Sequence, residues 1–175
     1  DLMGKVTTPE TRTSLLGMRL GTLAGKNDAA GLRAAVAEYT AGRELKYGDR
    51  ERVFEAAVQC GEWDLAIAHA EAALPLATPE AFRADNATRK LTEQRVADFG
   101  RRRKVGALAA MGWAFANQGR LDRALPVLTE AADTDFRGYM GNTESAAGSY
   151  LGRALAMAGR HDDAERPLAI AALYG

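Results

Sequence analysis

Residues 108–131 read LAAMGWAFANQGRLDRALPVLTEA, and this stretch decides the fold. Apolar and small residues recur at three- and four-residue spacing on both sides of Gly119, as two buried helix faces joined by a tight turn require. Gly119 can adopt the left-handed conformation that ends a helix. Ala124, Leu128 and Ala131 then follow on one face of the second helix. The stretch therefore predicts a helical hairpin with closely packed helices.

The same spacing occurs three more times along the chain. Gly159, Gly61 and Gly25 each precede small or apolar residues five, nine and twelve positions later: Ala164, Leu168 and Ala171; Ala66, Ala70 and Ala73; Ala30, Ala34 and Ala37. Repetition on this scale indicates stacked helical hairpins. Because no segment shows the strict alternation of a strand, we predict an all-α fold of about eight or nine helices.

These residues resemble the tetratricopeptide repeat, a helix-turn-helix unit of about 34 residues. The resemblance is most specific in two copies, whose consensus positions hold Gly112, Phe115, Gly119, Leu121, Ala124, Leu128 and Ala131, and then Gly152, Gly159, Ala164, Leu168 and Ala171. The Trp that opens the family's first helix and its closing Pro are absent from all four copies. The resemblance implies a solenoid of helical hairpins.

We expect a single domain that spans residues 1–175. Its four repeats are predicted at residues 11–42, 49–78, 105–133 and 144–175, with an extra helical segment at 79–104. Thr78 and Pro79 have the residue types that open a helix, since Thr can cap it and Pro tolerates its first position. The extra segment either belongs to one long helix that runs toward Gln118 or breaks at Gly100.

In the tetratricopeptide family the first helices line a concave groove that typically binds an extended or helical peptide. By that resemblance, eight side chains line a partner-binding groove here: Arg19, Glu51, Glu55, Gln59, Trp113, Asn117, Ser149 and Arg153. Trp113 is either an aromatic anchor for a partner or a core residue packed against the extra segment. Arg19 and Arg153 either hold a carboxylate of the partner or belong to solvated helix faces.

Glu51 and Glu55 lie one helical turn apart and form an acidic patch. Neither histidine nor a metal-binding cluster supports them as a catalytic pair, and no phosphate loop, dinucleotide fingerprint or nucleophile elbow occurs. We therefore predict a non-enzymatic scaffold that binds a protein or peptide and needs no cofactor.

The alternative is an interaction or dimerisation domain of a larger protein whose catalytic or signalling part lies elsewhere. The chain opens on Asp1 rather than Met, and it ends after the apolar residues 170–173 without a polar capping helix. These features predict a homodimer through the uncapped C-terminal repeat, or a further domain that covers it.

The segment 133–144 has part of the pattern of a calcium-binding loop. Asp133, Asp135 and Glu144 occupy the first, third and twelfth positions, and Gly138 occupies the sixth. Arg137 stands at the fifth position, where an oxygen ligand belongs. The alternative is a polar loop between repeats.

The charge balance narrows the class of partner. The chain has 23 basic and 23 acidic residues, so it lacks the basic excess typical of nucleic-acid binders. Residues 80–104 are locally basic, which predicts either a site for an acidic partner or a solvated helix face. Cys60 is expected to be a small buried residue. No apolar run is long enough to span a membrane, and a cytoplasmic location is favoured.

Overall fold

The computed structural model describes residues 8–138 and 146–174, and this part of the chain is helical without a strand. The predicted all-α fold is confirmed. The elements are α1 (Pro9–Gly25), α2 (Ala29–Thr40), α3 (Tyr47–Gln59), α4 (Trp63–Ala73), the short 3-10 helix η2 (Leu74–Leu76), α5 (Pro79–Asp85), α6 (Glu93–Asn117), α7 (Leu121–Gly138), α8 (Ala147–Met157) and α9 (His161–Tyr174).

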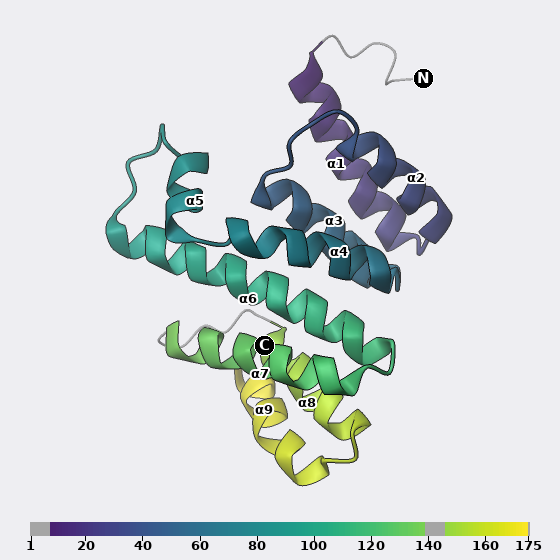
Figure 1. Cartoon of the computed structure of the whole chain (residues 1–175), viewed down its shortest axis with the longest axis vertical. Helices are drawn as coiled ribbons and strands as arrows, with labels where there is room; N and C mark the ends of the chain where they lie inside the picture. The colour runs from purple at the N-terminus through teal and green to yellow at the C-terminus, as the bar shows by residue number, and fades with distance from the viewer. Residues whose placement is uncertain (1–7, 139–145, 175) are drawn as a thin grey trace.

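The helices pair as consecutive hairpins along the long axis of the molecule. Helix α1 packs on α2, α3 on α4, α6 on α7, and α8 on α9. Figure 1 shows these pairs in chain order, from α1 and α2 at the top to α8 and α9 at the bottom. Four hairpins therefore follow one another, as the spacing of the turns predicts.

Three of the four hairpin turns have a glycine with positive φ, as expected from the sequence. Gly61, Gly119 and Gly159 have φ values of 69°, 75° and 72°. In the first hairpin the prediction of Gly25 was wrong, because Gly25 is still helical and Asn27 takes the left-handed conformation with φ 52°. Asparagine tolerates this region better than most residues. Asn27 lies 34 residues before Gly61.

This two-residue shift changes which face of α2 is buried. The predicted Ala30, Ala34 and Ala37 are exposed. Counting from Asn27 instead, the positions five, nine and twelve residues later are all buried: Leu32, Val36 and Tyr39. The spacing rule therefore holds in the first hairpin once it starts from the residue with positive φ.

A stability comparison tests this corrected turn. Gly25→Ala is expected to stabilise the protein by about 0.5 kcal/mol, since the residue is helical and no atom lies within 4 Å of an added Cβ. Gly61→Ala is expected to cost about 1 kcal/mol, because alanine disfavours positive φ. Urea unfolding of both variants measures whether each substitution raises or lowers the free energy of unfolding. Destabilisation by Gly25→Ala would contradict the assignment of the turn to Asn27.

Large and small side chains are matched where the two helices of a hairpin meet. A Cβ at Gly112 would lie 2.6 Å from Leu128 Cγ, and a Cβ at Gly152 would lie 2.5 Å from Leu168 Cγ. In the second hairpin the corresponding positions hold Phe54 and Ala70, which share one buried cluster. The sizes at these two positions are reversed, with the large residue on the first helix and the small one on the second.

The extra segment forms a separate short helix and lengthens the next hairpin. Thr78 caps α5 by accepting a hydrogen bond from the Ala81 amide at 3.1 Å. Helix α6 then runs through Gly100, so of the two alternatives the long helix toward Gln118 is the one that forms, and the first helix of the third hairpin starts at Glu93 rather than near 105. A Cβ at Gly100 would lie 2.7 Å from Pro79 N. Gly100 thus lets α5 pack directly on α6.

Arg103 connects the extra segment to the second hairpin. Its guanidinium lies over the rings of Tyr47 and Phe82, 4.7 and 4.8 Å from their centroids. It also pairs with Asp85 at 2.9 Å. Phe82 in turn stacks on Phe99. These contacts join α3, α5 and α6, so the first part of α6 is held against the repeats rather than projecting freely.

The first helices of the hairpins form one continuous layer. Helix α1 packs on α3, α3 on α6, and α6 on α8. The second helices α4 and α7 pack against the next first helix, and within residues 8–138 and 146–174 no second helix makes comparable contact with another second helix. The surface along α1, α3, α6 and α8 is therefore the one on which a partner would meet every hairpin.

Candidate functional site

Two cavities open along the layer of first helices. One, of about 450 Å³, lies between α3, α6 and α8, and the other, of about 340 Å³, lies between α1 and α3. Glu55 and Gln59 line both, so the two cavities adjoin on either side of these residues, and we call the surface that includes both the groove. Its other lining residues are Phe54, Val58, Gly106, Ala109, Ala110, Ala146 and Tyr150 on one side and Ser14, Gly17, Met18, Gly21, Arg52 and Ala56 on the other.

Small residues of α6 keep the floor of the groove open. Gly106, Ala109 and Ala110 follow at three- and four-residue spacing on the side that faces α3 and α8. A Cβ at Gly106 would lie 3.4 Å from the Tyr47 hydroxyl, which donates a hydrogen bond of 2.6 Å to the Arg103 carbonyl. Longer side chains at these positions would fill the groove, so its depth depends on the small residues of the repeat.

Two of the predicted groove residues are carboxylates in unfavourable surroundings. Glu55 is exposed as a residue, but the atoms around its carboxylate displace part of its water and raise its pKa above the ordinary value. Burial, together with the negative charge of Glu55, raises the pKa of Glu51, although the nearby Tyr47 hydroxyl and Arg103 oppose this. Glu55 therefore brings partly desolvated negative charge to both cavities, whereas Glu51, one turn before it on α3, lines neither.

Trp113 lies under an aromatic and a cationic side chain of α8. Its ring stacks on Tyr150 with centroids 4.7 Å apart and planes at 8°, and the Arg153 guanidinium lies 4.4 Å from its centroid. Only 8% of Trp113 is exposed. Its ring therefore packs against α8 rather than against the extra segment, and Arg153 is engaged with it. Tyr150 lines the groove instead.

Tyr150 is a groove residue that the sequence analysis missed. It lies one turn before Arg153 on α8 and nine residues before Gly159, as Ala110 lies nine residues before Gly119. This equivalence of Tyr150 with Ala110 was the sequence signal that could have identified Tyr150 as a groove residue. Burial raises the pKa of the Tyr150 hydroxyl, with Arg153 opposing this and the charge of Glu55 adding to it, and both Tyr150 and Glu55 line the larger cavity.

The remaining predicted groove residues lie at its margins. Arg19 pairs with Glu38 of α2 at 3.4 Å, next to Arg12, which pairs with the same carboxylate at 3.0 Å. Asn117 donates a hydrogen bond to the Trp113 carbonyl at 2.8 Å. Ser149 is half-buried on α8. None of the three residues lines either cavity, whereas Glu55 and Gln59 line both.

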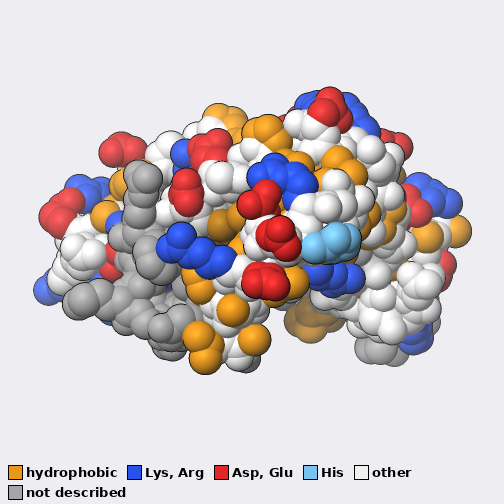
Figure 2. Space-filling model, turned by 90° about the horizontal axis from the view of Figure 1, so that it is seen from below, with side chains coloured by type: hydrophobic (Ala, Val, Ile, Leu, Met, Phe, Trp, Pro, Cys, Tyr) orange, Lys and Arg blue, Asp and Glu red, His pale blue; other side chains and the backbone are white. Residues whose placement is uncertain are grey.

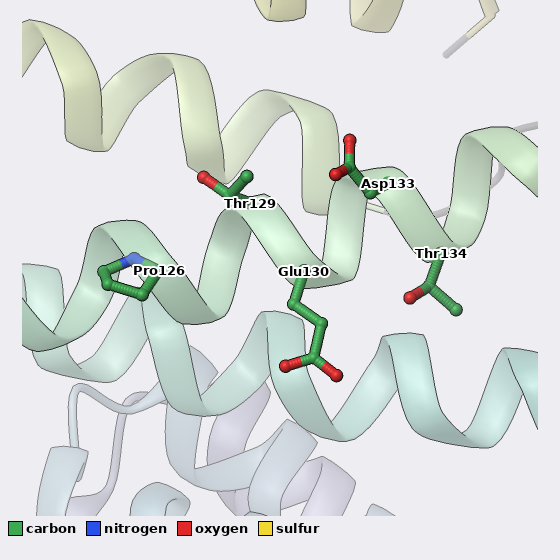
Figure 3. Close-up of a pocket in the computed structure, with 5 residues that line it drawn as sticks. All are labelled: Pro126, Thr129, Glu130, Asp133 and Thr134. Carbon is green, nitrogen blue, oxygen red and sulfur yellow. The ribbon is translucent and has the colours of Figure 1, made fainter.

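The described half of the segment 133–144 does not have the conformation of a calcium-binding loop. Residues 133–138 are still part of helix α7, so Asp133 and Asp135 cannot open a ligand-bearing loop, and Glu144 lies outside the described residues. Figure 3 shows Asp133 and Glu130 pointing to different sides of α7, beside a shallow pocket that also involves Pro126. Glu130 pairs with Lys104 of α6 at 2.7 Å. The acidic residues therefore do not converge on one point.

Several basic side chains of the segment 80–104 form ion pairs with acidic residues of the same segment. Arg83 pairs with Glu93, Arg101 with Asp98, and Arg103 with Asp85. The face shown in Figure 2 also has acidic and basic side chains interspersed with hydrophobic ones. These pairs favour the solvated helix face over an anion-binding site.

Cys60 is half-buried, with its thiol directed at the carbonyls of Leu23 and Ala24 at 3.9 Å. Burial and the charges of Glu62 and Asp28 raise its pKa. This environment disfavours the reactive thiolate.

The chain has no detectable relative in any of three comparisons: no protein-family model, no curated protein and no solved structure matches it. In the described part of the chain no helix is both long and apolar enough to cross a membrane.

The raised pKa of Glu55 predicts how stability depends on pH. A group whose pKa is higher in the folded state stabilises the protein below its unfolded pKa and loses that contribution as the pH rises. Glu55→Gln should therefore raise the free energy of unfolding at pH 7, by less than about 1 kcal/mol for so exposed a side chain. Below pH 4 this advantage should vanish. Urea titrations at both pH values measure the difference in unfolding free energy between Glu55→Gln and the wild type. An equal difference at both pH values would contradict the desolvation of Glu55.

Proposed function

We propose that this protein is a non-enzymatic, tetratricopeptide-like scaffold that binds a peptide segment of a protein partner along α1, α3, α6 and α8. The observation that carries the proposal is that the two cavities adjoin along the first helices, with Glu55 and Gln59 lining both. A groove that crosses four helices suits an elongated ligand better than a compact one.

The character of the groove also supports binding rather than catalysis. Its floor is made of glycine and alanine, and its polar residues lie along its length. An enzyme needs a nucleophile or acid-base group and stabilising donors converging near one reacting atom. The two glutamates supply charge without such a set around them.

Selection from a displayed library of random peptides on the whole chain tests this proposal. Gln59→Trp is the blocking variant, because Gln59 is exposed and lines both cavities. Ala68→Trp is the matched control, since Ala68 is an exposed residue of α4 outside the groove. Peptides enriched on the wild type should be lost on Gln59→Trp and kept on Ala68→Trp. Equal retention on both variants would contradict groove binding.

Self-association is a second candidate function, favoured by apolar side chains of the last hairpin. Leu173 is 77% exposed and Met157 is 50% exposed. Sedimentation velocity across a wide concentration range should show a dimer that Leu173→Glu converts to monomer. A single monomeric species at every concentration would exclude this candidate and leave the groove proposal intact.

A further inference from the structure

Glu55, which lines both cavities, has negative charge without a cationic partner. Glu51 and Glu55 lie one turn apart on α3, and no ion pair within 4 Å joins either carboxylate to a basic side chain in residues 8–138 and 146–174. Loss of water raises the pKa of both groups, and for Glu51 the Tyr47 hydroxyl, Arg103 and Arg52 oppose this only in part. A cation placed between them would relieve this cost.

The neighbouring arginines are held by other groups. Arg103 pairs with Asp85 at 2.9 Å, and Arg153 lies over the Trp113 ring. Arg52 points toward the Tyr39 hydroxyl, to which it donates at 3.5 Å. Their charges influence Glu51 from a distance, but none reaches the carboxylate of Glu55. The missing cation therefore has to come from a ligand.

The groove beside Glu55 fits a long basic side chain. Ala109 and Ala110 give an apolar floor, and the ring of Tyr150 stands at the α8 side. The methylene stem of lysine or arginine packs on such surfaces while its charged end reaches a carboxylate. An aromatic wall adds attraction for the cation.

We infer that the partner of this groove is a basic peptide segment, one of whose lysine or arginine side chains lies over Ala109 and Ala110 and pairs with Glu55, with Glu51 adding to the attraction. This inference rests on the proposed function and specifies the chemistry of its ligand. Small organic cations would satisfy the charge alone, whereas the length of the groove across four helices favours a peptide.

The composition of the selected peptides tests the inference. Groove-dependent peptides, defined by their loss on Gln59→Trp, should be enriched in lysine and arginine over the starting library. For one such peptide, labelled for fluorescence anisotropy, Glu55→Gln should weaken binding about fivefold or more, and Glu55→Lys by at least about tenfold. Glu44→Gln, at an exposed glutamate before α3, is the matched control and should leave the affinity unchanged. Circular dichroism verifies that each variant is folded.

The outcomes separate this inference from the proposal on which it rests. Groove-dependent peptides without basic enrichment, or an affinity unchanged by both Glu55 variants, would overturn the basic ligand and retain the peptide-binding groove. The absence of any groove-dependent peptide would overturn both. Basic peptides that bind equally well to Gln59→Trp would place the attraction elsewhere on the surface and also overturn the inference.

Discussion

Leu128→Ala is expected to lower the free energy of unfolding by about 3 kcal/mol. Leu128 is fully buried, and its side chain fills the space that Gly112 leaves between α6 and α7. Removing it leaves a cavity in the largest hydrophobic cluster, and leucine-to-alanine changes at such sites cost about 2–5 kcal/mol. Urea denaturation followed by circular dichroism measures the change.

A compensating change at Gly112 should restore part of this loss. Gly112→Leu alone should cost about 2 kcal/mol, because its side chain would collide with Leu128. Combined with Leu128→Ala, it should recover at least about 1 kcal/mol, since the second hairpin already pairs a large Phe54 with a small Ala70. Leu32→Ala in the first hairpin is the control partner, and its effect should add to that of Gly112→Leu. If the double variant lost the sum of the free energies lost by Gly112→Leu and Leu128→Ala, the two side chains would not share one space, which would contradict this account.

Trp113→Ala is expected to destabilise the protein by about 3 kcal/mol and to loosen the last hairpin. The Trp113 ring contributes the stacked contact with Tyr150 and the cation–π contact with Arg153, both between α6 and α8. Truncation of a buried tryptophan to alanine costs about 3–5 kcal/mol. Denaturant unfolding measures the total loss in the free energy of unfolding, and amide hydrogen exchange shows which helices become less protected.

The exchange experiment has a matched control in the other tryptophan. Trp63 begins α4 in the second hairpin and packs against the hydrophobic cluster that contains Phe54 and Leu128. Trp113→Ala should accelerate exchange in α8 and α9 more than in α1 and α2, whereas Trp63→Ala should act mainly on α3 and α4. The same uniform acceleration in both variants would mean that Trp113 does not specifically hold α8.

The hairpins themselves were predictable from local sequence. Gly119 and Gly159, and the small residues after them, encode the turn and the buried face within about twenty residues. The first hairpin misled the prediction because Gly25 precedes Asn27, and glycine is the more common residue with positive φ. The left-handed position in that hairpin is Asn27.

The parts that depend on distant contacts were harder to predict. The sequence left open whether a helix breaks at Gly100, because the packing of Gly100 against Pro79 is set by the return of α5 onto α6. Arg19 lies on a first helix, but its ion pair with Glu38 of α2 directs it away from the groove. Tyr150 was overlooked because its role follows from its stacking on Trp113 of another hairpin. Helical spacing gives the face of each helix, but not the partner of each side chain.

Peptide titration followed by backbone nuclear magnetic resonance tests the central claim most directly. The probe is a peptide that the wild-type chain selects and Gln59→Trp loses. The account predicts that the shifted amides concentrate in α1, α3, α6 and α8, with the largest changes around Glu55 and Gln59, which line both cavities. Shifts concentrated instead in α2, α4, α7 and α9 would contradict it.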